Sequence, residues 1–238
     1  MEETRHFGNI VLNIPHSSDN IPVNTWQGDI TKSVATWTDW HTDKLFKPNS
    51  TYLIKPVVFP VSRFFCDFER LIDDPLEKIG QGIFYTDFDM CRRPMDHSLY
   101  VYARKLYDSH RIFISSFIRP DTLVIDCHSF PGTLAPDTDI CIGYNEDWSK
   151  PSQGTIDCIV DTFLDAGYNV DINRPYSNSI TPKDSNDYKS VMIEVNKKQY
   201  LNPDNTLNPV GYAKLNGVLN YLYSKLISNG DTGDDKIL

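Results

Sequence analysis

Residues 122–129 read TLVIDCHS: a largely apolar run over residues 122–127, followed directly by a histidine and a serine. Continuous apolar runs of this length are typical of strands that helices cover on both faces. Residues 10–14 (IVLNI) form a second such run, which leads through Pro15 into His16 and Ser17. The sequence therefore predicts two buried strands, each with a histidine within two residues of its end.

Beyond these two runs, the chain alternates between short apolar stretches and segments with helical periodicity. Further strands are predicted at residues 52–58, 139–142 and 190–195, with a weaker candidate at 170–172. Apolar side chains at three- and four-residue spacing predict three helices. Their stripes are Leu99, Tyr102, Ala103, Leu106, His110, Phe113 and Phe117; Ile156, Ile159, Val160, Phe163 and Leu164, ended by Gly167; and Tyr212, Leu215, Val218, Leu219, Leu222 and Leu226.

This alternation predicts an α/β fold in which helices flank one mixed, largely parallel sheet. We expect residues 1–238 to form a single domain, with residues 229–238 as a frayed polar tail. No repeat and no glycine-rich phosphate loop is present. The sequence therefore does not favour nucleotide binding.

Composition narrows the possible partners and compartment. The net charge is −9, which argues against nucleic-acid binding because such a surface repels phosphates. The five cysteines include no C-x-x-C pair, and no apolar run of about 18 residues or secretory signal occurs. We expect a cytoplasmic protein, without a membrane span, that acts on a small molecule.

The two histidines predict a metal site. Ligands collect beyond the carboxyl ends of strands in open α/β sheets, and a catalytic zinc commonly has three protein ligands plus water. The third ligand could be the carboxylate of Asp39, Asp43 or Asp19. The alternative is that His16 and His128 are ordinary hydrogen-bonded loop residues, as we expect His110 to be an ordinary buried histidine on its helix.

Glu194 interrupts the apolar run of residues 190–195. By the two-residue alternation of a strand it faces away from Ile193 and Val195. A carboxylate inside a strand is costly to bury unless it is paired, so it marks either an exposed edge or a site. In a site, Glu194 would be a general base.

Arginines supply groups that could bind an anionic substrate. Arg63 and Arg70 flank an aromatic segment, and Arg174 follows a predicted strand. A guanidinium binds a carboxylate through two hydrogen bonds and stays charged at working pH. These arginines could equally be structural partners of the nearby acidic residues, which are Asp67, Glu69, Asp73 and Asp74.

Six segments in this order resemble the N-formylglutamate amidohydrolases. They are residues 15–17 (PHS), 38–43 (TDWHTD), 62–70 (SRFFCDFER), 126–129 (DCHS), 173–176 (NRPY) and 193–194 (IE). The resemblance extends over about residues 10–200. It implies a zinc carboxypeptidase- or aspartoacylase-like fold and the zinc-dependent removal of an N-formyl or other N-acyl group from an acidic amino acid such as glutamate.

The resemblance also implies roles for individual residues. His16, His128 and Asp39 would bind zinc, and Asp43 is the second candidate for the carboxylate ligand. Glu194 would be the general base and acid, and Arg63 would lie near the substrate carbonyl or carboxylate. Arg70, Asn173 and Arg174 would bind substrate. The chain departs from the usual pattern at Ser18, where glycine is common, and at Glu69, where asparagine is common.

Other interpretations stay open at this point. The same fold could support a carboxypeptidase-like enzyme acting on short peptides, or a protein that binds a ligand without catalysis. Ser129 or Cys127 could be a nucleophile, although no nucleophile-elbow pattern surrounds them. Asp126 could orient an imidazole from the second coordination shell, or could make a sheet contact.

Overall fold

The structure is a computed structural model that describes residues 6–176 and 188–227. Within these residues, six strands form one sheet in the order β2-β1-β5-β8-β6-β7. The bounds are β1 Asn9–Ile14, β2 Ile54–Val58, β5 Thr122–Phe130, β6 Ile140–Gly143, β7 Val170–Ile172 and β8 Lys189–Asn196. All neighbouring pairs are parallel except β6 and β8, which are antiparallel. The fold is thus a mixed, largely parallel α/β sheet, as the sequence predicts.

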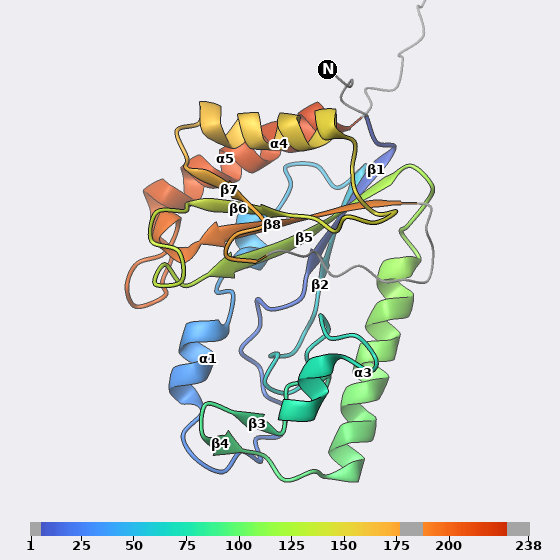
Figure 1. The fold of residues 1–238 in the computed structure, drawn as a ribbon, viewed down its shortest axis with the longest axis vertical. Coiled ribbons are helices and arrows are strands. Elements are labelled where there is room, and N and C mark those ends of the chain that lie inside the picture. Colours follow the sequence, from blue (N-terminus) through green and yellow to red (C-terminus); the bar gives the residue numbers. More distant parts are fainter. Residues whose placement is uncertain (1–5, 177–187, 228–238) are drawn as a thin grey trace, which may run out of the picture.

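Helices cover both faces of this sheet. Their bounds are α1 Thr31–Trp37, α2 Thr42–Leu45, α3 His97–Ser115, α4 Gln153–Asp165 and α5 Pro209–Leu226, with short 3-10 helices at Pro75–Ile79 and Lys197–Gln199. Figure 1 shows α4 and α5 above one face, with α1, α3 and the two-stranded β3–β4 unit (Asp87–Phe88 and Cys91–Arg92) on the other side.

The two faces of each central strand enter different cores, as the two-residue alternation requires. Leu123, Ile125 and Cys127 pack in the core under α4 and α5, whereas Val124 packs with α3. His128 is even-numbered like Val124, so it faces the second side. This alternation leaves one face of the sheet free to carry polar groups near its carboxyl edge.

The strands match the predicted ones to within two residues at most ends, with one consequential exception. β5 continues to Phe130, three residues beyond the predicted end, because its ladder with β8 extends to the pair Phe130 and Asn196. The expectation that His128 follows the strand was therefore wrong. His128 lies within β5, where a regular ladder fixes its position.

The predicted stripe of α3 is rotated relative to the observed one. Tyr102 and Phe113 are 43% and 51% exposed, while Tyr107 and Ile114 are buried in their place. The two sets overlap at Ala103 and His110, so three- and four-residue spacing alone could not choose between them. Gly167 does follow α4 with a left-handed φ of 83°, as predicted for the residue after a helix end.

Two remaining expectations concern the tail and the membrane. Residues 229–238, predicted to be frayed, lie outside the described residues. In the part of the chain that is described, no helix has the length and apolar character needed to cross a membrane.

His110 is buried, as predicted, and its environment is aromatic. Its ring lies edge-on to Phe59 and Phe68, with centroid distances of 4.9 and 4.3 Å. Its Nε2 has no hydrogen-bond partner among the described residues. Burial lowers the pKa of His110 to about 4, from an ordinary value of 6.5.

This environment predicts a pH-dependent stability. Between about pH 6.5 and 4 the unfolded chain takes up a proton at His110 that the folded protein excludes, so unfolding is favoured as the pH falls. From pH 7 to pH 5, wild type should lose about 2 kcal/mol more unfolding free energy than His110→Phe does. Urea unfolding at both pH values measures this difference. An exposed-histidine control, His97→Gln, should behave like wild type; equal losses in wild type and His110→Phe would contradict the interpretation.

Candidate active site and metal centre

Three strands bring His16, His128 and Glu194 to one edge of the sheet. β1 ends at Ile14, and Pro15, which has no N–H group to continue the ladder, places His16 just beyond it. β5 and β8 are parallel neighbours in which His128 and Glu194 are directly paired. All three side chains are buried. The β-ladder therefore sets the spacing between the second histidine and the glutamate.

Asp39 joins this group from outside the sheet. It lies in the turn between α1 and α2, where its backbone N–H donates to the carbonyl of His16 at 2.9 Å. Its Oδ2 lies 3.1 Å from Nδ1 of His128 and 3.9 Å from Nδ1 of His16. One ligand atom from each of the three residues falls within 4.8 Å of the other two. A single cation could therefore contact all three.

Asp67 determines which nitrogen of His16 faces Asp39. Its carboxylate is fully buried, and Oδ1 lies 2.8 Å from Nε2 of His16. Although burial opposes ionisation, His16, Arg70 and Arg63 together hold the pKa of Asp67 well below its usual range. An ionised carboxylate only accepts hydrogen bonds, so Nε2 carries the hydrogen. The lone pair of a neutral His16 is then on Nδ1.

The donor set fits a zinc ion. Two imidazole nitrogens and one carboxylate oxygen are common protein ligands of a catalytic zinc. Nδ1 of His16 is a buried nitrogen without a hydrogen-bond partner among the described residues. An acceptor in this position, facing a carboxylate, is satisfied by a cation. Tetrahedral zinc with bonds of about 2.0–2.1 Å separates its ligand atoms by about 3.4 Å, close to the spacing observed here.

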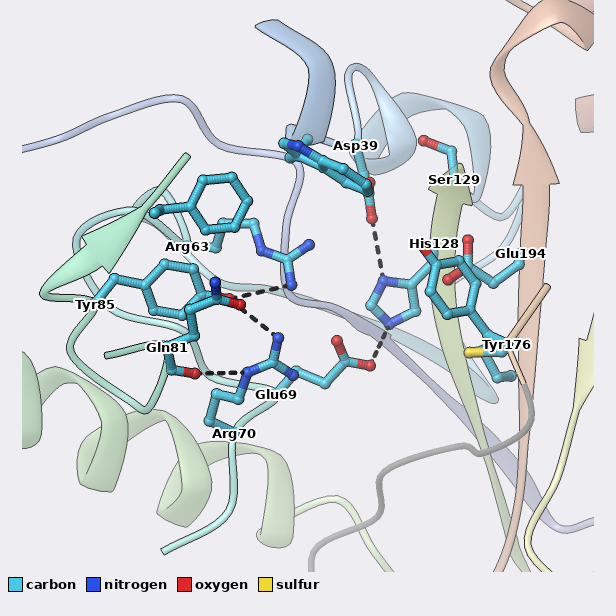
Figure 2. Close-up of a pocket in the computed structure, with 13 residues that line it drawn as sticks. Asp39, Arg63, Glu69, Arg70, Gln81, Tyr85, His128, Ser129, Tyr176 and Glu194 are labelled. Atoms are coloured by element: carbon cyan, nitrogen blue, oxygen red, sulfur yellow. Dashed lines mark hydrogen bonds and ion pairs between the residues drawn. The ribbon is translucent and has the colours of Figure 1, made fainter. Parts of the chain in front are cut away.

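Glu69 contacts both imidazoles from the cavity side. Its Oε1 lies 3.1 Å from Nε2 of His128, and its Oε2 lies 3.8 Å from Nδ1 of His16. The first contact is at ion-pair distance. His128 thus has a carboxylate beside each ring nitrogen (Figure 2).

Glu194 is buried, and its Oε2 has no hydrogen-bond partner within the described part of the chain. Burial raises the pKa of Glu194 above its ordinary value. His128 opposes this rise, while the carboxylates of Asp39 and Glu69 add to it. A carboxylate with a raised pKa is suited to exchanging protons near neutral pH. Because β8 has neighbours on both sides, the exposed-edge alternative for Glu194 does not apply.

Asp39, Glu69, His128 and Glu194 line a cavity of about 450 Å³. Figure 2 shows Arg63, Arg70 and Tyr85 on the wall opposite His128 and Glu194. The Tyr85 hydroxyl donates to Oδ2 of Asp67 at 2.6 Å and accepts from Nη2 of Arg70 at 3.1 Å. Arg63 also donates to Oδ2 of Asp67, at 3.2 Å. The cavity therefore offers two partly exposed cations to a ligand.

Comparison with known proteins gives the family. A family model described as N-formylglutamate amidohydrolase matches residues 8–201. The chain belongs to the N-formylglutamate amidohydrolase family. Two solved structures share its fold. An N-formylglutamate amidohydrolase from Ralstonia eutropha JMP134 has a TM-score of 0.76 at 16% identity, over 94% of each chain. A gene product of Agrobacterium tumefaciens has a TM-score of 0.66 at 17% identity, over 92% of this chain and 90% of that one. No curated protein gives a significant match.

In this member of the amidohydrolase family, most of the predicted site residues lie together. His16, Asp39 and His128 converge, and Arg63, Arg70 and Glu194 line the adjoining cavity. Of the other candidate carboxylates, Asp19 is exposed and Asp43 is half-buried, and the structure groups neither of them with the two histidines. The sequence also offered Arg63 and Arg70 as structural partners of nearby acidic residues. Both arginines do lie within ion-pair distance of Asp67.

The segment of residues 173–176 is placed differently from the expectation. The Arg174 side chain is 65% exposed and pairs with Asp171 at 3.1 Å. Asn173 has a left-handed φ of 55°, and its Oδ1 accepts from the backbone N–H of Tyr144. Neither residue lines the cavity, so the structure does not support their predicted contact with substrate. Tyr176, which the sequence did not single out as a site residue, reaches the cavity instead.

The structure also places residues 126 and 127. Asp126 accepts a hydrogen bond from Nδ2 of Asn13 on the neighbouring strand, at 2.9 Å, which is the sheet contact. Cys127 points to the opposite face of β5 and packs in the core, where burial raises the pKa of its thiol. It does not lie on the cavity side.

Asp67 and Tyr85 were missed as site residues, because their roles depend on the fold of the segment between β2 and α3. Arg93 organises this segment: its buried guanidinium lies 3.6 Å from the ring centre of Phe84 and donates to the carbonyls of Tyr85 and Phe65. A buried arginine contacting backbone carbonyls has no local sequence signature. The signal available for Asp67 was its spacing from Arg63 and Arg70, four residues before it and three after.

The contacts of Asp67 predict a large loss of stability when its charge is removed. Asp67→Asn should lower the unfolding free energy by about 3 kcal/mol or more, because two guanidiniums lose their buried partner. A matched control is Asp87→Asn, where the Asp87–Arg92 pair is 48% and 80% exposed and 3.5 Å apart. That change should cost less than about 1 kcal/mol. Urea unfolding distinguishes the two; equal, small losses would contradict the proposed role of Asp67.

Proposed function

We propose that the protein is a zinc-dependent amidohydrolase that removes an N-acyl group, with formyl as the expected one, from an acidic amino acid such as glutamate. The observation that carries this proposal is the convergence of His16, Asp39 and His128 next to a cavity that Asp39, His128 and Glu194 line. Membership of the family supplies the reaction class, which is hydrolysis of an amide. The pair of arginines on the cavity wall supports an anionic substrate.

His16, Asp39 and His128 would hold the zinc ion through Nδ1, a carboxylate oxygen and Nδ1 respectively. When bound there, the ion would act as a Lewis acid that lowers the pKa of a water molecule and polarises the acyl oxygen of the substrate. Asp67 supports this arrangement by keeping the hydrogen of His16 on Nε2. A carboxylate on the far nitrogen of a ligating histidine is a common means of orienting the ring.

Glu194 would move the proton. Its unpaired Oε2 can accept the proton that the attacking water loses, and the same oxygen can later donate it to the leaving amine. The amide C–N bond breaks as the carboxylate product and the free amine form, so one water is consumed and no redox partner is needed. The raised pKa of Glu194 favours both directions of this transfer near neutral pH.

Arg63 and Arg70 would bind and orient the substrate. Arg63 is close to the proposed metal ligand Asp39, since its charge interacts with Asp39 and Glu69 as well as with Asp67. It can stabilise negative charge that develops on the acyl oxygen. Arg70, which is held by the carbonyl of Gln81 and the hydroxyl of Tyr85, can bind the carboxylate of the amino acid.

The test measures formate release from N-formyl-L-glutamate by zinc-loaded protein. It compares wild type with the Glu194→Gln variant. The variant should keep its zinc and lose about 10²- to 10⁴-fold in kcat, because the proton acceptor is gone. Glu146→Gln, a change at an exposed pair with Lys150, is the control and should retain full activity. A dipeptide and N-acetyl-L-glutamate, assayed in parallel, identify the bond that is cleaved.

Three results would count against the proposal. Retained turnover in Glu194→Gln would exclude Glu194 as the proton acceptor. Preferential cleavage of the dipeptide would favour the carboxypeptidase-like alternative. Zinc binding without hydrolysis of any of the three compounds would favour the non-catalytic one.

A further inference from the structure

Asp39 is positioned differently from the other two residues proposed to bind zinc. His16 and His128 are held by β1 and β5, whereas Asp39 lies in the turn between α1 and α2. Helix α1 has only seven residues and lacks a side-chain cap at its start. The position of the Asp39 carboxylate therefore depends on what holds this turn against the sheet.

Lys197 is the first of these contacts. It follows the last residue of β8 directly, three positions after Glu194, and only 9% of it is exposed. Its Nζ donates to the carbonyl of Thr36 at 2.6 Å and to that of Thr38 at 2.7 Å. Lys197 thus binds the last turn of α1 and the residue that directly precedes Asp39.

Tyr200 makes the second contact that holds this turn. It is fully buried, and its hydroxyl donates to the carbonyl of Trp40 at 2.9 Å. Trp40 directly follows Asp39 in the chain. The backbone is therefore held on both sides of Asp39 by two side chains from the same short segment, residues 197–200.

Burying an ammonium group costs several kcal/mol unless it is paired, so a buried lysine marks a place where its contacts are strong. Lys197 has two carbonyl acceptors at the negative end of a helix, and its charge also interacts with the carboxylates of Asp39 and Glu194. Lys197 does not line the cavity described above. Its contacts therefore suit holding the turn in place and not touching substrate.

We propose that Lys197 and Tyr200 are positioning residues that clamp the backbone on either side of Asp39, and so hold its carboxylate at cation-binding distance from His16 and His128. This inference rests on the proposed function, because it assumes that Asp39 is a zinc ligand. The two side chains also join β8, which carries Glu194, to the turn that carries Asp39. A shift of β8 would then move the proposed base and the proposed ligand together.

The experiment measures the zinc dissociation constant of the folded protein by competition with a chromophoric chelator. Lys197→Met keeps the length of the side chain but removes its charge and hydrogen bonds, and it should raise the zinc Kd at least tenfold. Tyr200→Phe loses one neutral hydrogen bond and should raise it by about fivefold. Tyr200→Phe removes a single oxygen atom. It tests the proposed clamp by itself if Lys197→Met does not fold.

Each variant has a matched control in the chain. Lys198→Met changes the neighbouring, exposed lysine. Tyr223→Phe removes another buried tyrosine hydroxyl, which donates to the carbonyl of Phe46 at 3.2 Å. Both controls should bind zinc as tightly as wild type. Any general loss of stability is measured separately, as the melting temperature of each metal-free protein.

A cobalt(II) spectrum provides a readout that lost stability alone would not change. Visible absorption of the cobalt-substituted protein reports ligand identity and geometry, so it should change in Lys197→Met and Tyr200→Phe and match wild type in both controls. Wild-type Kd and spectra in both clamp variants would overturn the clamp while leaving the proposed function in place. If wild type itself binds zinc no more tightly than His128→Ala does, the proposed function fails, and the clamp fails with it.

Discussion

The hydrogen bond from Nε2 of His16 to Asp67 is the constraint on which the site depends. Because the Asp67 carboxylate is fully buried, it must be surrounded by donors, and it receives them from His16, Arg63 and Tyr85. Satisfying this one charge draws the segment of residues 62–70 onto the end of β1. The same packing turns Nδ1 of His16 toward Asp39 and places Arg63, Glu69 and Arg70 on the cavity wall.

The charges of the site favour a cation. Four carboxylates, those of Asp39, Asp67, Glu69 and Glu194, surround two imidazoles, and the positive side chains nearby are Arg63, Arg70 and Lys197. Without an ion, protons relieve part of this charge. The carboxylates of Glu69 and Asp39 hold the pKa of His128 well above its usual range although burial opposes this, and burial raises the pKa of Glu194. A divalent ion between His16, Asp39 and His128 would take the place of the proton on His128.

The sequence predicted those parts of the site that a regular strand positions. His16, His128 and Glu194 could be found because strand ends and the two-residue alternation determine where such side chains lie. The residues alone narrowed the carboxylate ligand to three candidates, since a turn between two short helices has no such periodicity, and only the family resemblance favoured Asp39. Asp67, Tyr85 and Lys197 act through contacts with residues that are distant in the sequence. The separations are 51 positions for Asp67, 18 for Tyr85 and at least 159 for Lys197. Their roles depend on tertiary packing, which spacing along the chain does not reveal. Arg174, which was given a site role as an arginine after a strand, is paired with Asp171 at the surface, and its contact with substrate stays a prediction.

The most direct test of a shared cation is an anomalous difference map, collected just above and just below the zinc absorption edge, from a crystal of the zinc-loaded protein. A shared zinc ion would give one strong peak within bonding distance of Nδ1 of His16, a carboxylate oxygen of Asp39 and Nδ1 of His128. A peak that two of these three residues do not reach, or no peak in the cavity at saturating zinc, would contradict it.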